Sequence, residues 1–201
     1  MKKIVLIAFM LAICVATGRA QESRQDFSIS GTVLIPPFRA SQTAVQASAQ
    51  REFGTLVSYR FMVTPTSAFE GNFGMTYQGK MNYRIQNTNH YQVNNRTTEI
   101  SGAYVRSFTF KNFNPFVEAG GGAFIFLPVR DAETTSLDLK QVTEIGAIYG
   151  AGIAYEVSPS FDIRTEYRGL VLKVPSFGVN QLVTNKWYNI YAPSIGVAYH
   201  F

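Results

Sequence analysis

Hydrophobic and polar residues alternate along most of this chain with a period of two. In residues 27–35, apolar residues or glycine occupy every second position, and Ser28, Ser30 and Thr32 lie between them. Residues 53–61 and 69–77 repeat the alternation. Because successive side chains of a β-strand point to opposite faces, each segment is predicted to form a strand with one apolar and one polar face.

Five further segments show the same pattern. They cover residues 97–109, 117–125, 144–156, 161–168 and 191–201. The pattern is least regular in the first of them, because Glu99 and Ser101 on the polar face leave Arg106 on the apolar face. Either Arg106 extends toward lipid headgroups, or a β-bulge resets the register of this strand. The chain is therefore predicted to be all-β, with eight strands.

Short and long connections alternate between these strands. The short ones, at 63–67, 111–114 and 158–160, are rich in residues that favour turns. The long ones are polar and lie near residues 37–51, 80–96, 128–142 and 173–186. Outer-membrane barrels have short periplasmic turns and longer extracellular loops. The alternation predicts an eight-stranded antiparallel up-and-down transmembrane β-barrel, with both termini in the periplasm and four loops outside.

The first residues have the layout of a signal peptide. Lys2 and Lys3 precede an apolar run over residues 4–16, and Gly18 and Ala20 supply small residues for cleavage. The run is shorter than the roughly 20 residues that a membrane helix needs. Residues 1–20 are therefore predicted to be a cleavable signal peptide, with a cut after Gly18 as the alternative. Residues 21–201 would form the outer-membrane β-barrel domain.

Cysteine content and net charge exclude several kinds of site and ligand. Cys14 is the only cysteine and lies in the predicted signal peptide. Ile13 stands where a lipoprotein signal has a small residue, so lipidation of Cys14 is the less favoured alternative. The mature chain would have no thiol for a disulfide, a metal site or a nucleophile. Without Lys2, Lys3 and Arg19, 15 basic residues face 13 acidic ones. No basic cluster suits nucleic acid.

The polar face of the predicted strands carries charges of both signs. An eight-stranded barrel is just wide enough for its own side chains, and unpaired charges are costly to bury. We therefore predict a salt-bridged plug in the lumen, with space left by Gly146, Gly150 and Gly152. Its predicted members are Arg60, Glu70, Glu118, Glu144, Glu156, Asp162, Arg164, Glu166 and Arg168. The alternatives are an ion path, a catalytic carboxylate pair, or a soluble lipocalin-like barrel with the two faces exchanged.

Several stretches resemble outer-membrane proteins. Ile195, Val197, Tyr199 and Phe201 alternate up to the end of the chain, which resembles the C-terminal signal recognised by the outer-membrane assembly machinery. Residues 114–123 (Asn-Pro-Phe-Val-Glu-Ala-Gly-Gly-Gly-Ala), 150–159 and 163–167 resemble three strands of the small barrel family related to the transmembrane domain of outer membrane protein A. The resemblance implies an eight-stranded barrel in the outer membrane. It implies no single activity, because members act as anchors, adhesins or narrow pores.

The leading functional hypothesis is a structural or surface-interaction protein. Its loops would meet lipopolysaccharide, a host or neighbouring surface, or other envelope proteins. An outer-membrane lipid-modifying enzyme is an alternative that would use His90, with Glu99 in reach, because His200 lies near the chain end. A narrow pore is the third hypothesis. The sequence contains no metal-binding cluster, phosphate-binding glycine loop or dinucleotide fingerprint, so we expect no cofactor, no metal and no catalytic residue.

Overall fold

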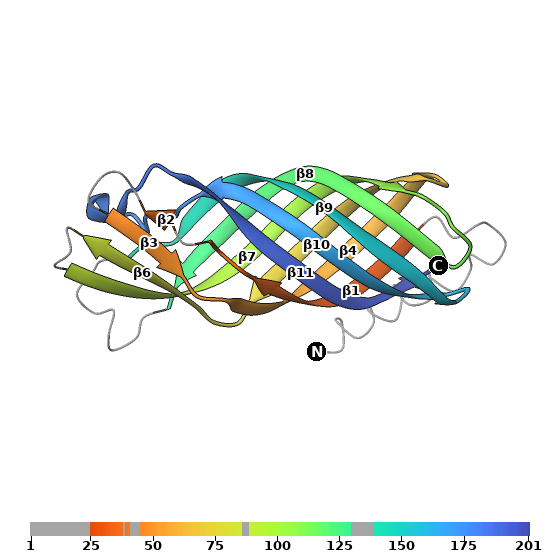
Figure 1. The fold of residues 1–201 in the computed structure, drawn as a ribbon, viewed down its shortest axis with the longest axis horizontal. Coiled ribbons are helices and arrows are strands. Elements are labelled where there is room, and N and C mark those ends of the chain that lie inside the picture. Colours follow the sequence, from red (N-terminus) through yellow and green to blue (C-terminus); the bar gives the residue numbers. More distant parts are fainter. Residues whose placement is uncertain (1–24, 38, 41–44, 86–88, 130–138) are drawn as a thin grey trace, which may run out of the picture.

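The computed structural model describes residues 25–37, 39–40, 45–85, 89–129 and 139–201. Eight antiparallel strands in this part of the chain close into a barrel (Figure 1). No helix among the described residues is long and apolar enough to cross a membrane. The predicted signal peptide, residues 1–20 with Cys14, lies outside the described residues.

The barrel strands follow one another around the wall in chain order. They are β1 (Gln25–Leu34), β4 (Glu52–Thr64), β5 (Ser67–Thr76), β7 (Asn89–Ser107), β8 (Phe113–Pro128), β9 (Val142–Ser158), β10 (Phe161–Lys173) and β11 (Trp187–His200). Pairing of β11 with β1, with Tyr199 opposite Phe27, closes the wall. The predicted fold class and strand number are therefore confirmed. We call the end where β1 begins and β11 ends the terminal end.

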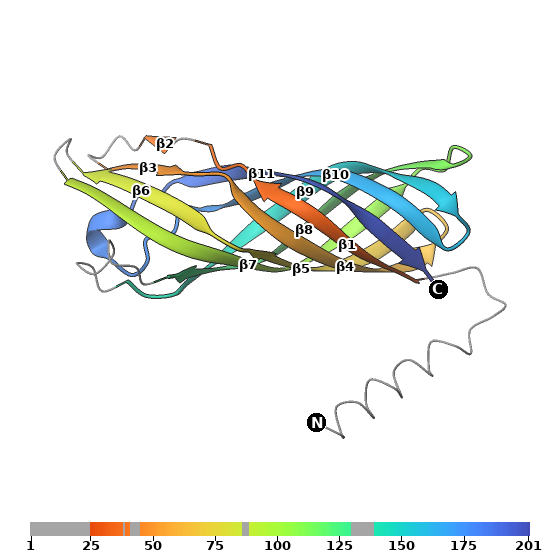
Figure 2. The same ribbon diagram turned by 90° about the horizontal axis from the view of Figure 1, so that it is seen from below.

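At the opposite end three strands extend the wall. These are β2 (Arg39–Ala40), β3 (Val45–Ala49) and β6 (Gly79–Ile85). β3 pairs with β6, and β6 pairs with the first residues of β7 (Figure 2). We call β3, β6 and residues 89–95 the outer sheet. The prediction of loops at 37–51 and 80–96 was therefore wrong over these strands. Their polar composition concealed the alternation, in which Met81 and Tyr83 are buried and Arg84 is exposed.

The fourth barrel strand, β7, has a regular register. It pairs with β5 without a shift from Arg106 opposite Ser67 to Thr98 opposite Met75. Glu99 and Ser101 are buried, whereas Arg106 is exposed. The β-bulge alternative is thus contradicted along this pairing, and Arg106 remains on the outward face.

The outward face of the barrel is apolar and the inward face carries the charges. Large hydrophobic side chains are exposed along all eight barrel strands, whereas the arginines of β4 and β10 are buried. Contiguous apolar surface of this extent is not typical of a soluble monomer. Alternation therefore places the apolar face toward lipid, which excludes the lipocalin-like alternative with the faces exchanged.

Candidate functional site

The half of the lumen near the terminal end is filled by ion pairs. Arg60 binds Glu70, with Nη2 at 2.6 Å and Nε at 2.7 Å from Oε2. Arg164 donates from Nη2 to both carboxylate oxygens of Asp26 at 3.0 Å, and its Nη1 lies 3.5 Å from Glu70 Oε2. The ring of Phe116 lies beside both guanidinium groups, 4.7 Å and 5.7 Å from them. Four strands, β1, β4, β5 and β10, are thus linked through the interior of the barrel.

Arg168 extends this network toward the middle of the barrel. Its Nη2 lies 2.6 Å from Glu99 Oε2, and its Nε lies 3.8 Å from Glu166 Oε1. Ser101 donates to the other oxygen of Glu99 at 2.6 Å. The side chain of Arg168 is only 2 % exposed, so these carboxylates, and not water, neutralise most of its charge.

Gly150 makes room for this part of the network. It is the register partner of Glu118 on one side and of Arg168 on the other. A Cβ at this position would lie 2.9 Å from Glu118 Oε1 and 3.2 Å from Arg168 Cγ. A larger residue at position 150 would therefore displace the two charged side chains that meet there.

Three of these carboxylates also form the only candidate metal-ligand group among the described residues. One oxygen each from Glu70, Glu118 and Glu166 lies within 4.8 Å of the others, and all three side chains are buried. Oxygen ligands of this kind suit a hard divalent cation. However, the guanidinium groups of Arg60 and Arg168 share the same carboxylates. The arrangement is better described as an ion-pair network than as a metal centre.

The structure does not bring all the predicted residues together. Asp162 is buried but pairs with His200, Nε2 to Oδ2 at 2.9 Å, at the terminal end. Glu144 is half-buried at the other end of the barrel, and Glu156 is exposed. The inclusion of Glu144 and Glu156 in the plug was therefore wrong. Both occupy inward positions by alternation, but they lie near strand ends, where the wall no longer encloses them.

Two members of the network were not predicted. Asp26 is two residues before Ser28, so its side chain points to the same face of the strand, but it precedes the first segment in which alternation was recognised. Glu99 lies on the strand whose pattern was least regular. It was placed on the polar face and was considered as a partner of His90, but it was not included in the predicted plug. The backbone of His90 pairs with Arg84 in the outer sheet, and its side chain lies outside the described residues. Extending the alternating pattern by one residue toward the start of the first strand would have identified Asp26.

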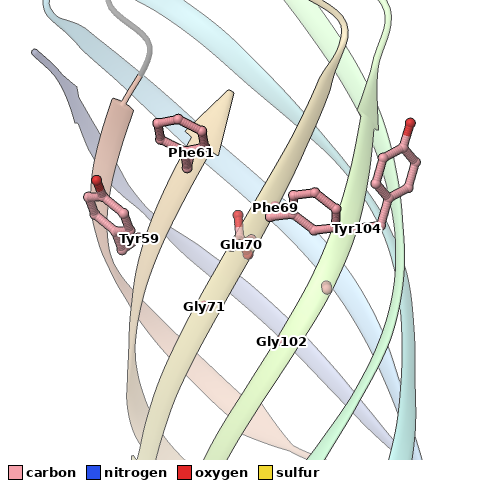
Figure 3. Close-up of a pocket in the computed structure, with 8 residues that line it drawn as sticks. Tyr59, Phe61, Phe69, Glu70, Gly71, Gly102 and Tyr104 are labelled. Carbon is pink, nitrogen blue, oxygen red and sulfur yellow. The ribbon is translucent and has the colours of Figure 1, made fainter. Parts of the chain in front are cut away.

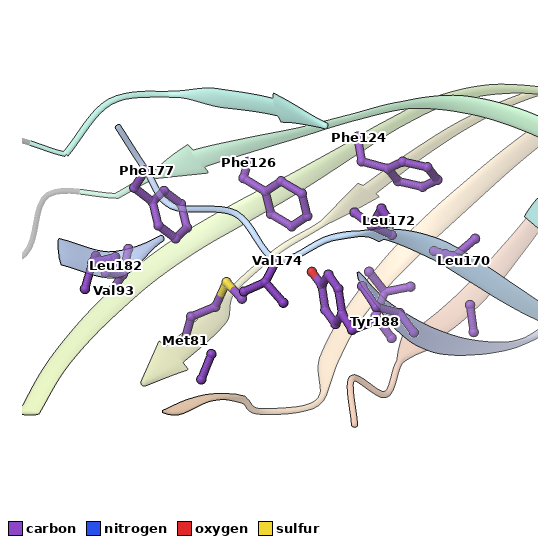
Figure 4. Packing of buried hydrophobic residues seen from close by; sticks show 14 of the residues in the cluster. Met81, Val93, Phe124, Phe126, Leu170, Leu172, Val174, Phe177, Leu182 and Tyr188 are labelled. Carbon is purple, nitrogen blue, oxygen red and sulfur yellow. The ribbon is translucent and has the colours of Figure 1, made fainter. Parts of the chain in front are cut away.

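The other half of the lumen is filled by an apolar cluster (Figure 4). Phe124, Phe126, Ile148, Leu170 and Leu172 occupy inward positions there and are at most 2 % exposed. The prediction that the inward face is polar along the whole barrel was therefore wrong for this half. All five residues point to the same face as the charged positions. Phe126, Leu170 and Leu172 lie beyond the segments in which alternation was recognised, whereas Phe124 and Ile148 lie within two of those segments as apolar residues on the predicted polar face.

The connection between β10 and β11 folds into this cluster. Val174, Phe177 and Leu182 are buried, and a short 3-10 helix spans Asn180–Leu182. Tyr83 of the outer sheet donates a hydrogen bond to the carbonyl of Pro175 at 2.6 Å, and burial raises the pKa of Tyr83 well above its ordinary value. The predicted polar loop at 173–186 is therefore, in part, a cover over the lumen.

A polar groove lies on the outer sheet. Its volume is about 350 Å³, and it is lined by Gln46, Ser48, Asn82, Tyr83, Arg84, Tyr91 and Gln92. Amide, hydroxyl, guanidinium and aromatic groups thus line one concave surface beyond the closed barrel. This combination can donate and accept hydrogen bonds and can bind a negative charge.

The comparison with known proteins agrees with the outward apolar face and the closed eight-stranded wall. A family model for the outer membrane protein beta-barrel domain matches residues 5–201. The chain belongs to this family. The resemblance inferred from the sequence is thereby confirmed, and the outer membrane is the location of this barrel. No curated protein matches the sequence.

Solved structures with the same fold include other outer-membrane barrels. OprG from Pseudomonas aeruginosa is 14% identical, with a TM-score of 0.66 over 90% of this chain and 97% of that one. Neisserial surface protein A is 15% identical, with a TM-score of 0.55 over 87% and 97%. Ail of Yersinia pestis, in complex with the heparin analogue sucrose octasulfate, is 13% identical, with a TM-score of 0.51 over 89% and 99%. At these identities the likeness concerns the fold.

Proposed function

We propose that this outer-membrane barrel has a structural or surface-interaction role and does not conduct solutes. The filling of the lumen at two successive levels carries this proposal. The ion pairs of Arg60, Arg164 and Arg168 occupy one half, and the apolar cluster around Phe124 occupies the other. Eight strands leave little bore beyond the volume of such side chains. Activity would therefore reside on the surface beyond the membrane.

The lengths of the connections support a proposed orientation in the membrane. The terminal end, with tight turns at 65–66 and 159–160, would face the periplasm, and the outer sheet would face outward. Residues 1–20 would be removed as a signal peptide. Ile195, Val197 and Tyr199 are exposed on β11 with Phe201 just beyond it, where the assembly machinery would recognise them.

The outer sheet is the proposed binding surface. Its groove combines the amides of Gln46 and Asn82 with the hydroxyl of Ser48 and the cation of Arg84. These groups suit an anionic saccharide, such as the phosphorylated sugars of lipopolysaccharide. Ail, a barrel of the same fold, has been solved with a sulfated saccharide analogue, which supports this class of ligand. The connection at 173–186 would border the same surface, and most of the connection at 128–142 lies outside the described residues.

Planar-bilayer recordings test the closed lumen. The folded protein is expected to give no conductance steps under conditions in which a general porin, added as a positive control, conducts. The reason is that ion pairs and apolar side chains at two levels would block a continuous water path. Steps that depend on the folded form, judged by its mobility on a gel with and without boiling, would contradict the closed lumen.

Binding to immobilised lipopolysaccharide tests the groove. Arg84→Gln is expected to weaken binding about tenfold, because it removes a charge-assisted hydrogen bond to phosphate. Lys140→Gln is the matched control, since it removes an exposed positive charge that does not line the groove. Equal losses for both variants would indicate general charge attraction, and no loss for either would contradict a saccharide site on the outer sheet.

A further inference from the structure

A second concave surface lies on the lipid-facing side of the barrel near the terminal end (Figure 3). Its volume is about 450 Å³, within the range of small-molecule sites. It is lined by Tyr59, Phe61, Phe69, Glu70, Gly71, Gly102, Ala103 and Tyr104. Glu70 and Ala103 are buried on the inward face, so they contribute backbone to the groove.

Two glycines form the floor of this groove. Gly71 and Gly102 are direct register partners on β5 and β7. A Cβ on Gly71 would meet nothing within 4 Å, and one on Gly102 would meet only a backbone oxygen at 3.8 Å. Neither glycine is therefore required for packing within the wall. Because these two positions have no side chain, the backbone is exposed to the membrane here, whereas neighbouring positions carry large side chains.

The glycines lie between bulky residues along the same pair of strands. On the terminal side, the rings of Phe69 and Tyr104 meet edge to face, with centroids 5.9 Å apart. On the other side, Phe73 and Ile100 are register partners and are 47 % and 54 % exposed. The groove is thus a bounded depression in a surface that is otherwise covered by protruding apolar groups.

A polar cluster lies just beyond the aromatic pair. Arg106 Nη1 donates to Ser67 Oγ at 2.7 Å, and Tyr104 Oη donates to the same oxygen at 2.9 Å. Ser67 and Arg106 are register partners at the end of the ladder. No ion pair joins Arg106 to a carboxylate in the part of the chain that the structure describes. An exposed arginine at this depth requires an anion or water, and the lipid headgroup region supplies phosphate.

We propose that this surface binds one phospholipid molecule. Its phosphate would meet Arg106, Ser67 and the hydroxyl of Tyr104. One acyl chain would lie over Gly71 and Gly102, between the rings at the headgroup level and the Phe73–Ile100 pair deeper in the membrane. Along this pair of strands, the charged group comes first, then the aromatic rings, then the exposed glycine backbone. A phospholipid has its phosphate, its glycerol region and its acyl chains in the same order. The proposal uses the orientation given above, in which this end meets the phospholipid leaflet.

Native mass spectrometry of the folded, detergent-released protein with added phosphatidylglycerol tests the site. Gly71→Leu fills the groove, and Arg106→Gln removes the cation. Each is expected to weaken lipid retention about tenfold. Gly31→Leu is the control for the first, because Gly31 is an exposed strand glycine with no neighbour nearer than a backbone oxygen at 4.0 Å. Arg51→Gln is the control for the second, since Arg51 is exposed near the other end of the barrel.

Selective loss in the two site variants, with folding verified by heat-modifiable gel mobility, would support the site. Equal retention in all five proteins would overturn it, as would a loss in only one of the two site variants. Preferential retention of lipid A over phosphatidylglycerol would also overturn it, because it would place this end of the barrel in the outer leaflet. That outcome would leave the proposal of a closed lumen unaffected. A change of oligomeric state in Gly71→Leu, with lipid retention unchanged, would assign the groove to a second copy of the chain instead.

Discussion

Replacement of Arg164 by methionine is expected to destabilise the folded barrel by about 3–5 kcal/mol. Arg164 is 3 % exposed and binds Asp26 and Glu70 at once. Methionine has a similar volume but no charge, so two carboxylates in a narrow lumen would lose a shared cation. Asp26 would lose both of its contacts with the guanidinium, whereas Glu70 would keep its contact with Arg60.

Urea titration of the barrel in lipid vesicles measures this effect, with gel mobility reporting the folded fraction. The double variant Asp26→Asn, Arg164→Met is the control, because it removes both members of the Arg164–Asp26 pair and leaves no lone charge on Asp26. It is expected to be more stable than Arg164→Met alone. A single variant as stable as the unmodified protein would show that water, and not Arg164, neutralises these carboxylates.

Replacement of Phe124 by alanine is expected to cost about 3–5 kcal/mol. Phe124 is 1 % exposed and lies in the apolar half of the lumen. A Cβ on Gly146 would approach its ring at 3.1 Å, so the strand that bears Gly146 packs closely against it. The rigid wall of a closed barrel cannot collapse onto the cavity that alanine would leave, which favours the larger losses in the expected range.

The same titration measures this loss, and Phe124→Leu is the matched control. Leucine keeps an apolar side chain of similar size, so its cost is expected to stay below about 1.5 kcal/mol. Losses of equal size in the two variants would indicate that the aromatic ring itself, and not the filled volume, is required. Little loss in either variant would contradict a tightly packed core in this half of the barrel.

Alternation along the sequence was sufficient for the fold class and for most of the buried charges. Arg60, Glu70, Arg164 and Arg168 could be assigned to the lumen because side-chain direction in a strand depends only on parity. Glu144 and Glu156 satisfy the same parity and are nevertheless outside the network. Parity does not specify how far along the barrel axis a side chain lies, and enclosure depends on that height.

The sequence by itself determined the eight strands, their apolar outer face and the presence of charges of both signs inside. These features follow from a period of two and from turn residues. Only the tertiary structure decided which charges meet. The contact of Arg164 with Asp26 joins residues 138 positions apart, and it depends on the stagger between strands when the sheet closes. Closure also decided that the lumen has an apolar half and that residues 173–186 fold over it. The same register placed Gly71 beside Gly102 and Arg106 beside Ser67, which no local pattern in the chain specifies.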